Sequence, residues 1–384
     1  MKVLFLSAWY PHRNDPMSGL FVRKHAEAVA MHASTAVLYV VLDKNCKNIH
    51  LATVTSCNLT ELIVYFPNPR MDWFHRLSML INYIKAYLTG FKKLHEVWGK
   101  PDIIQVNVFT RHAVAAWLYS KFYKIPYVVI EHWTRYFEPR TFGNIYHKKL
   151  TQFVAKKASV ILPVTSHLKA NMLSHGLINS NYQIINNVVD KPFFNVIKQE
   201  NRSKKQVLSV TCFDDNQKNL SGILRVTSRL HNIRQDFELT LVGSGADFEK
   251  IKQLATDMDL YPTVVRFPGV LKGEKLVAEF YNCDFTLLFS NYENIPVVIS
   301  ESLVCGKPVL STNVGGISEH VDADNGVLIE KQNEDALFDA LNIMLDTYTN
   351  FNNTTIAVKA AQKYSYHEVG RKLHQVYQQV LKNK

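Results

Sequence analysis

Residues 290–309 read Ser-Asn-Tyr-Glu-Asn-Ile-Pro-Val-Val-Ile-Ser-Glu-Ser-Leu-Val-Cys-Gly-Lys-Pro-Val and decide the fold of the chain. An apolar segment at 285–289 precedes them and predicts a strand, while Gly306 ends a helical pattern before the next apolar run. The stretch is therefore predicted to form a strand, a loop, a helix and a second strand. Alternation of this kind is typical of parallel α/β sheets, which bind ligands at the carboxyl ends of their strands.

Two carboxylates frame the loop and the helix in this stretch. Glu293 falls in the loop after the first strand, and Glu301 follows eight positions later in the helix. Pro296 suits the first helical turn, where its missing N–H removes no hydrogen bond. Backbone N–H groups at the helix start would then face an anion, namely those of Asn294, Ile295 and Val297. This arrangement suits a ligand in which a phosphate is flanked by hydroxyl-rich groups, as in a nucleotide-sugar.

The run resembles the signature of retaining GT-B glycosyltransferases of family 4. Glu-x7-Glu is followed by Ser-Leu-Val-Cys-Gly-Lys-Pro-Val and then by Thr-Asn-Val-Gly-Gly-Ile-Ser-Glu at 312–319. The pair of acids alone would also fit an ordinary capped helix with two solvated carboxylates, but the flanking residues favour the resemblance. The resemblance implies a GT-B fold, in which two Rossmann-like, doubly wound α/β domains face each other across a cleft.

Composition and length are those of a soluble protein with two domains. The chain has 384 residues, 47% of them hydrophobic, and we find no run of about 18 apolar residues that would span a membrane. The first residues predict a buried strand and not a signal peptide. Five cysteines without Cys-x-x-Cys spacing are typical of reduced thiols, so we expect a cytoplasmic protein.

The charge balance favours anionic partners. The formal net charge is +11, which suits phosphates, nucleic acid or an acidic lipid leaflet, but no basic block or nucleic-acid motif stands out and we expect no nucleic acid. Residues 73–98 combine apolar residues at helical spacing with Arg76, Lys85, Lys92 and Lys93. Such a helix can lie on an anionic membrane, or it can face the core with its lysines outward. The resemblance supports a peripheral contact with the inner membrane face, because family members often use lipid-linked acceptors.

The first half of the chain alternates apolar, β-branched segments with helical patterns. This predicts a parallel sheet covered on both faces, with strands at 2–7, 36–42, 62–66, 102–107, 127–130, 160–163 and 183–187. Gly19 ends a long loop before a helix at 21–33, and the resemblance places it near the donor phosphates. His132 follows the strand at 127–130, and the resemblance gives it a contact with the donor sugar. A turn glycine and a structural histidine are the alternatives.

The second half restarts with a strand at 206–211. Lys218 and Asn219 match the lysine end of a family motif that holds the donor diphosphate, but the motif's arginine is absent and Cys212 or Phe213 stands in its place. This puts the usual two-cation clamp in doubt. Further donor contacts are expected after the strands at 237–242 and 264–267, from Gly243, Gly245, Val270 and Leu271. Position 248 is Phe, so no Gly-x-Gly-x-x-Gly motif supports a dehydrogenase.

The resemblance also implies domain boundaries and roles. An acceptor domain would comprise residues 1–189 with a returning helix at 365–384, and a nucleotide-sugar domain would comprise 190–364, with 191–205 as the linker. Glu293, His132 and Lys218 form the predicted catalytic set: Lys218 would stabilise the leaving diphosphate and Glu293 would bind the donor sugar. Glu301 would bind the ribose. Asp322 and Asp324 are interpreted as turn residues, and neither a metal nor another cofactor is expected.

The predicted function is retaining transfer of a sugar from a UDP- or GDP-linked donor to a hydroxyl. The acceptor would be a glycan or a lipid-linked molecule, and surface polysaccharide synthesis is the setting that the resemblance implies. Two alternatives stay open at this point. The missing arginine would suit a non-catalytic subunit that only binds nucleotide-sugars, and the same fold could carry a nucleotide-sugar epimerase or hydrolase.

Overall fold

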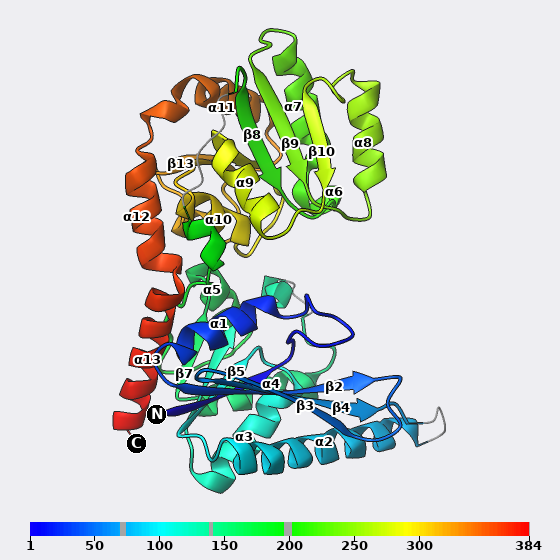
Figure 1. The fold of residues 1–384 in the computed structure, drawn as a ribbon, viewed down its shortest axis with the longest axis vertical. Coiled ribbons are helices and arrows are strands. Elements are labelled where there is room, and N and C mark those ends of the chain that lie inside the picture. The colour runs from blue at the N-terminus through cyan, green and yellow to red at the C-terminus, as the bar shows by residue number, and fades with distance from the viewer. Residues whose placement is uncertain (70–73, 138–140, 196–201, 384) are drawn as a thin grey trace. The chain divides into compact units, whose positions relative to one another are not determined.

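Two β-sheets, one in each half of the chain, organise the fold (Figure 1). The computed structural model describes residues 1–69, 74–137, 141–195 and 202–383. The chain divides into two compact units. The first unit comprises Met1–Val164, Leu168–Val188 and Tyr366–Lys384. The second unit comprises Thr165–His167 and Val189–Ser365.

The sheet of the first unit is almost entirely parallel. Among the described residues its strands pair in the order β3-β4-β2-β1-β5-β6-β7, and only β3 runs antiparallel to its neighbour. The strands are β1 Lys2–Ser7, β2 Ser34–Asp43, β3 His50–Ser56, β4 Leu59–Pro67, β5 Ile103–Asn107, β6 Tyr127–Glu131 and β7 Val160–Pro163.

Helices cover both faces of the first sheet, which explains why its central strands are largely apolar. On one face, α1 (Leu20–Ala30) packs against the returning α13 (Tyr366–Lys382), and alternate residues of β1, Val3 and Phe5, share a core cluster with both helices. The other face carries α2 (His75–Val97), α3 (Arg111–Tyr123) and α4 (Ile145–Lys157), as Figure 1 shows. The helix α5 (Ser166–Ser174) follows β7.

The sheet of the second unit is parallel, with its described strands in the order β10-β9-β8-β11-β12-β13. The strands are β8 Lys205–Val210, β9 Phe237–Val242, β10 Val265–Gly269, β11 Phe285–Leu288, β12 Val309–Thr312 and β13 Gly326–Ile329. Successive residues of β8 face opposite sides, so Val207 and Leu208 belong to different core clusters.

Two helical layers cover the second sheet. The layer on the side of Val207 contains α7 (Leu220–His231), α8 (Phe248–Asp257) and α11 (Glu334–Thr347). The layer on the side of Leu208 contains α9 (Glu274–Asn282), α10 (Val297–Val304) and α12 (Asn353–Tyr364). Both sheets are therefore doubly wound, as the sequence predicts.

The structure corrects three predicted elements. Residues 183–187 form no strand, although Gln183 and Ile185 donate single backbone hydrogen bonds to carbonyls of β7. The antiparallel β3 was missed. The segment 191–205 was predicted as an irregular linker, but Lys191–Phe194 forms a 3-10 helix and β8 already begins at Lys205. The positions 73 and 196–201 lie outside the described residues.

Candidate active site

The predicted donor-binding residues of the second half lie in loops that follow four strands of one sheet. Lys218 ends the short helix α6 (Asp215–Lys218) after β8, and Glu293 lies in the loop after β11. Gly243 follows β9 and Val270 follows β10. Because these strands are parallel, their carboxyl ends share one edge of the sheet, which is where such sheets bind ligands.

A buried ion pair lies at this edge. Lys218 Nζ contacts Glu293 Oε1, and only 11% of the lysine side chain and 7% of the glutamate side chain are exposed. Ser290 Oγ donates a hydrogen bond of 2.9 Å to the same carboxylate oxygen. Both charges are thus largely withdrawn from water, where an unpaired charge would be costly. The second unit therefore brings together the two residues that were predicted for the donor sugar and the diphosphate.

Hydrogen bonds between two loops hold this pair in place. The backbone N–H of Asn291 donates to Gln217 O over 2.8 Å, and the Asn291 side chain donates to Asn216 O over 2.8 Å. In return Gln217 Nε2 donates to Tyr292 O over 3.3 Å. Asp214 caps α6 by accepting from the Gln217 N–H. Hydrogen bonds therefore join the loop after β8, which carries Lys218, to the loop after β11, which carries Glu293.

Asn219 has a backbone role in the structure. It adopts the left-handed conformation, with φ 48° and ψ 46°, and stands between the end of α6 and the start of α7. Asparagine tolerates this conformation better than most residues. Its side chain lies against Gly222, where an added Cβ would come within 2.7 Å of Asn219 Oδ1. Asn219 thus sets the change in chain direction between α6, which ends at Lys218, and α7.

The loop after β12 was not assigned a role from the sequence, yet it wraps around Glu293. Gly315 has φ +60°, and a Cβ there would lie 1.9 Å from Glu293 O. The neighbouring Gly316 N–H donates to Asn294 O over 2.8 Å, and Thr312 Oγ1 donates to Ser290 O over 2.7 Å. The Gly-Gly pair within the family signature was the available sequence signal for this close approach.

The helix α10 begins one residue later than its proline suggests. Pro296 is the N-cap, with ψ 123°, and Val297 is the first helical residue. The residue before a proline disfavours the helical conformation, so Ile295 and Asn294 stay in the loop. Asn294 is buried and its Oδ1 accepts a hydrogen bond of 3.1 Å from Thr165. Pro296 therefore does not occupy the first turn, and Glu301 lies half-buried in the second turn of α10.

Gly243 and Gly245 lie against the backbone of the loop after β8. An added Cβ would come within 1.8 Å of Thr211 O at Gly243 and within 2.4 Å of Phe213 O at Gly245. Of the two residues that stand where the arginine is missing, Cys212 is exposed, whereas Phe213 is fully buried and packs on Phe248 with ring centroids 4.9 Å apart. Neither residue therefore supplies the positive charge that an arginine would bring to the sheet edge.

The remaining predicted contacts lie next to Gly243. Its N–H donates to Gly269 O over 2.9 Å, which places the start of the Val270 segment beside the loop after β9. Val270 is 54% exposed, whereas Leu271 is half-buried and packs on the core cluster around α9 and α10. Of the two residues, Val270 is thus the more accessible to a ligand.

The first unit holds the other two predicted residues, Gly19 and His132, at the carboxyl edge of its sheet. Gly19 has φ +61°, and an added Cβ would lie 2.3 Å from Trp9 O. His132 follows β6, and its ring lies 4.5 Å from that of Phe21 and 5.4 Å from that of His25. Phe21 comes two residues after Gly19, so both predicted residues border one aromatic group of the first unit.

His132 is a neutral imidazole near pH 7. Burial lowers its pKa well below the usual value, the neighbouring His25 lowers it further, and a hydrogen bond with Asn187 offsets part of the effect. A neutral imidazole can donate one hydrogen bond and accept another, which suits the recognition of a sugar hydroxyl. The surroundings of His132 therefore fit ligand binding better than transfer of a proton at neutral pH.

Glu131, next to His132, holds the loops of this edge together. It is fully buried, and its carboxylate accepts hydrogen bonds of 3.0 Å from the N–H groups of Phe109, His132 and Trp133. A fourth hydrogen bond comes from Tyr136 Oη over 3.3 Å. With its oxygens occupied in this way, Glu131 positions the loop after β6 and leaves little capacity for a ligand.

Comparisons with known proteins agree with the resemblance to GT-B glycosyltransferases. The model described as Glycosyltransferase Family 4 matches residues 47–191, and the model described as Glycosyl transferases group 1 matches residues 190–363. An uncharacterized glycosyltransferase of Methanocaldococcus jannaschii is 25% identical over 88% of this chain and 86% of its own. An N-acetylgalactosaminyltransferase of Campylobacter jejuni, whose name includes a diphospho-undecaprenol glycan, is 25% identical over 53% of this chain and 56% of its own.

A solved structure has the same fold. HepE of Anabaena, solved in complex with UDP, superposes with a TM-score of 0.72 over 99% of this chain and 100% of its own, at 16% identity. The chain is a GT-B glycosyltransferase. Within this glycosyltransferase, the second unit carries the Lys218–Glu293 pair and the first unit carries Gly19 and His132.

Asp322 and Asp324 of the glycosyltransferase lie in a turn. Asp322 Oδ1 accepts from the Asp324 N–H over 3.0 Å, and Asp324 pairs with Lys359 over 2.8 Å. Across the described ranges, no cluster of three or more His, Cys, Asp or Glu side chains has the geometry to hold a metal ion. In the same residues, every helix is too short or too polar to cross a bilayer.

Proposed function

We propose that this glycosyltransferase transfers a sugar, with retention of the anomeric configuration, from a UDP- or GDP-linked donor to a hydroxyl. The acceptor is a glycan or a lipid-linked molecule in the synthesis of a surface polysaccharide. The observation that carries the proposal is the buried Lys218–Glu293 pair at the carboxyl edge of the second sheet. The UDP complex of HepE supports a nucleotide donor, and the name of the C. jejuni relative supports a lipid-linked acceptor.

Negative charge develops on the diphosphate as the donor's glycosidic bond breaks. Lys218 and the first N–H groups of α10 stabilise that charge, and electrostatic stabilisation of this kind is commonly the largest contribution to catalysis. Glu293 accepts hydrogen bonds from hydroxyls of the donor sugar, and Glu301 accepts them from the ribose. His132 and Gly19 of the first unit contact the donor sugar and its phosphates.

Donor binding exchanges the partners of the buried pair. Without a donor, Lys218 and Glu293 neutralise each other. A nucleotide-sugar offers phosphate oxygens to the ammonium group and hydroxyl hydrogens to the carboxylate, so each charge keeps a partner after the exchange. The flexible four-carbon stem of lysine allows this movement. The pair thus holds both side chains in place until the donor arrives.

The transfer step balances within the donor and the acceptor. The acceptor oxygen forms its bond to the anomeric carbon on the face from which the diphosphate leaves, which retains the configuration. The diphosphate oxygen takes the proton of the acceptor hydroxyl. The two substrates thus supply all atoms of the step, and we expect no resident cofactor.

A membrane contact at the inner leaflet is part of the proposal. The helix α2, which was predicted to be amphipathic and basic, exposes Leu77 (55%), Ile84 (49%) and Leu88 (64%). Large apolar side chains in such number on one helix are costly in water and suit a membrane interface. We propose that the protein works in the cytoplasm as a peripheral enzyme at an anionic membrane.

A panel of nucleotide-sugars tests the donor. The cognate nucleotide-sugar should raise the melting temperature by mass action, and calorimetry with UDP and GDP should identify the base. Glu301→Gln should weaken nucleotide binding at least tenfold, while Glu293→Gln should mainly reduce turnover. Glu249→Gln, an exposed acid on α8, is the matched control. Unchanged kinetics in both site variants would reject the proposed site.

Product analysis separates transfer from the alternatives. With donor and acceptor together, the anomeric configuration of the product should match that of the donor. A free sugar as the main product, even with acceptor present, would favour a hydrolase, and an interconverted nucleotide-sugar would favour an epimerase. Inversion of configuration would overturn the proposed mechanism while leaving the donor assignment intact.

A further inference from the structure

The excess positive charge of the chain is concentrated on one helical layer. The helices α2, α3 and α4 together contain ten lysines and arginines but a single acidic residue, Glu96. The whole chain has a net charge of +11, so these three helices account for most of it. They lie side by side on one face of the first sheet (Figure 1). This face therefore attracts anions far more strongly than an average protein surface.

The same layer exposes large apolar side chains. On α3 these include Leu118, 55% exposed, and Phe122, 79% exposed. On α4 they include Tyr146, Leu150 and Phe153. Together with the α2 residues described above, they form a mixed apolar and cationic surface. A surface of this composition complements an amphiphile that carries both hydrocarbon and negative charge.

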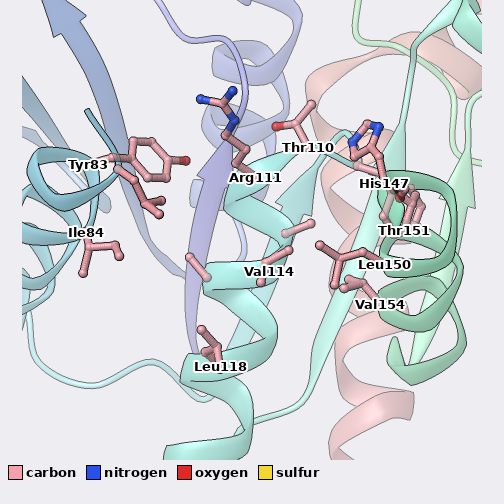
Figure 2. A pocket seen from close by; sticks show the side chains of 14 residues that line it. Tyr83, Ile84, Thr110, Arg111, Val114, Leu118, His147, Leu150, Thr151 and Val154 are labelled. Atoms are coloured by element: carbon pink, nitrogen blue, oxygen red, sulfur yellow. Dashed lines mark hydrogen bonds between the residues drawn. The ribbon is translucent and has the colours of Figure 1, made fainter. Parts of the chain in front are cut away.

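An apolar groove lies between the three helices. Its volume is about 300 Å³, and its lining is almost entirely apolar, with Tyr83 and Ile84 from α2, Val114 and Leu118 from α3, and Leu150 and Val154 from α4. Figure 2 shows Arg111 and Thr110 at one end of the groove and Leu118 at the other. At 1.5 Å per helical residue, the distance from Arg111 to Leu118 along α3 is about 10 Å.

A cationic cavity adjoins the groove at the Arg111 end. It has a volume of about 570 Å³ and is lined by His75, Arg76 and Arg111 together with apolar residues of α2. Arg111 lines both cavities, as do Leu80 and Tyr83, so the two cavities are immediate neighbours that share these side chains. Two guanidinium groups beside the groove can donate hydrogen bonds to a phosphate. The groove next to them is apolar and offers water few hydrogen-bond partners.

We propose that the groove binds the hydrocarbon chain of an anionic lipid, whose phosphate is held by Arg76 and Arg111. The inference rests on the proposed function, because it makes this lipid the carrier of the acceptor hydroxyl. Arg111 begins α3 directly after the carboxyl end of β5, so the phosphate lies at the edge of the first sheet that also holds His132. The groove thereby defines the acceptor class as a phosphate-linked lipid and not a free glycan.

Binding of monomeric decyl phosphate to the full chain, followed by tryptophan fluorescence, tests the proposal. Trp117 lies on α3, so occupation of the groove should change its emission. Decyl phosphate should bind at least tenfold more tightly than inorganic phosphate or the uncharged decyl maltoside. Val114→Phe fills the groove without changing charge and should weaken decyl phosphate binding at least tenfold, as should Leu150→Glu. Ile343→Phe, at an exposed position of α11, should have no effect.

Other outcomes overturn the proposal. Equal binding by Val114→Phe and the natural protein would show that the chain does not enter the groove. Equal affinity for inorganic phosphate would show that the hydrocarbon contributes nothing. A dimer that Val114→Phe dissociates would assign the groove to a second copy of the protein. Circular dichroism confirms that each variant is folded before binding is measured.

Donor hydrolysis distinguishes failure of this inference from failure of the proposed function. Without an acceptor, the natural protein and Val114→Phe should hydrolyse the cognate nucleotide-sugar at the same slow rate, since Val114 lies outside the donor site. Hydrolysis without any binding of decyl phosphate would overturn the inference alone. Binding of decyl phosphate without binding of any nucleotide-sugar would reject the proposed donor chemistry and leave the groove as a lipid site.

Discussion

Gly315 controls where Glu293 can lie. An added methyl group would stand 1.9 Å from Glu293 O, and φ is +60°. The Gly315→Ala variant must therefore displace the backbone that carries the carboxylate, in addition to about 1 kcal/mol of strain from the left-handed conformation. We expect a loss of transfer activity of at least tenfold, because small displacements of catalytic groups are costly. Steady-state kinetics with the cognate donor would measure it.

Gly273→Ala is the control for that variant. Gly273 also has a positive φ, +55°, but no atom lies within 4 Å of an added Cβ. The Gly273→Ala variant therefore introduces backbone strain without the clash. Both variants should lose some stability, and only Gly315→Ala should lose activity. Equal activity in the two variants would show that Gly315 does not position the catalytic groups.

Glu131 is predicted to contribute strongly to the stability of the first unit. Its carboxylate satisfies three buried N–H groups and the Tyr136 hydroxyl, so Glu131→Ala leaves several donors without an acceptor. We expect a loss of about 3 kcal/mol in the free energy of unfolding. Glu96→Ala, whose side chain is 52% exposed in a pair with Lys93, should change it by less than about 0.5 kcal/mol. Urea titrations followed by tryptophan fluorescence measure the unfolding midpoints of both variants. Similar midpoints would show that Glu131 does not stabilise the first unit.

Single residues show what the sequence could reveal of the site. The family resemblance pointed to Lys218 and Glu293, but no spacing rule predicts that residues 75 positions apart form a direct ion pair. The end of a strand was enough to single out His132, whereas its burial beside His25 depends on which strands become neighbours. Ser290 acts within the loop after β11 and Gly315 acts through a contact between loops, and neither kind of contact leaves a periodic pattern in a sequence.

At the scale of elements, burial decides which strands the sequence reveals. Central strands such as β1 and β6 are covered on both faces and therefore read as nearly continuous apolar runs. The edge strand β3 is largely exposed and polar, so its pattern resembles a loop. Residues 183–187 contain the two adjacent isoleucines Ile184 and Ile185, yet the segment pairs with β7 only at single positions. Two adjacent β-branched residues thus do not by themselves predict a strand.

The exposed apolar residues of α2 lead to a prediction about membranes. The double variant Leu77→Glu with Leu88→Glu places two charges among them, so we expect binding to vesicles of phosphatidylcholine and phosphatidylglycerol to fall at least fivefold. Cosedimentation would measure the bound fraction, and 0.5 M salt should also reduce it by screening the basic residues.

Two exposed apolar residues of the second unit give the matched control. Ile343 and Val358 are 61% and 53% exposed, on α11 and α12. The double variant Ile343→Glu with Val358→Glu changes charge by the same amount and should bind vesicles almost as the natural protein does. If both double variants lose binding equally, the effect is general electrostatics and α2 is not the membrane contact.

At the scale of the whole molecule, the two units differ in buried histidines. Burial lowers the pKa of His25, His112 and His132 in the first unit and of His320 in the second, and the pKa values of His112 and His320 fall to about 4. An unfolded chain binds these protons near pH 6.5. Full stability is therefore present above pH 6.5 and is lost as the pH falls toward 4. At pH 5 the loss is about 2 kcal/mol for a histidine with a folded pKa of 4.

The first unit should consequently unfold more readily in acid than the second. Glu131 acts in the opposite direction, because burial raises its pKa, but one carboxyl group opposes three imidazoles. All five tryptophans precede residue 134, so their fluorescence reports on the first unit, while circular dichroism reports on both. We compare the urea midpoints of unfolding at pH 7.5 and pH 5. The midpoint from tryptophan fluorescence, which reports on the first unit, should fall further than the midpoint of the dichroism transition that is assigned to the second unit. His112→Asn should reduce the fall of the tryptophan midpoint. Equal shifts of the two transitions, unchanged in His112→Asn, would show that the buried histidines do not govern acid stability.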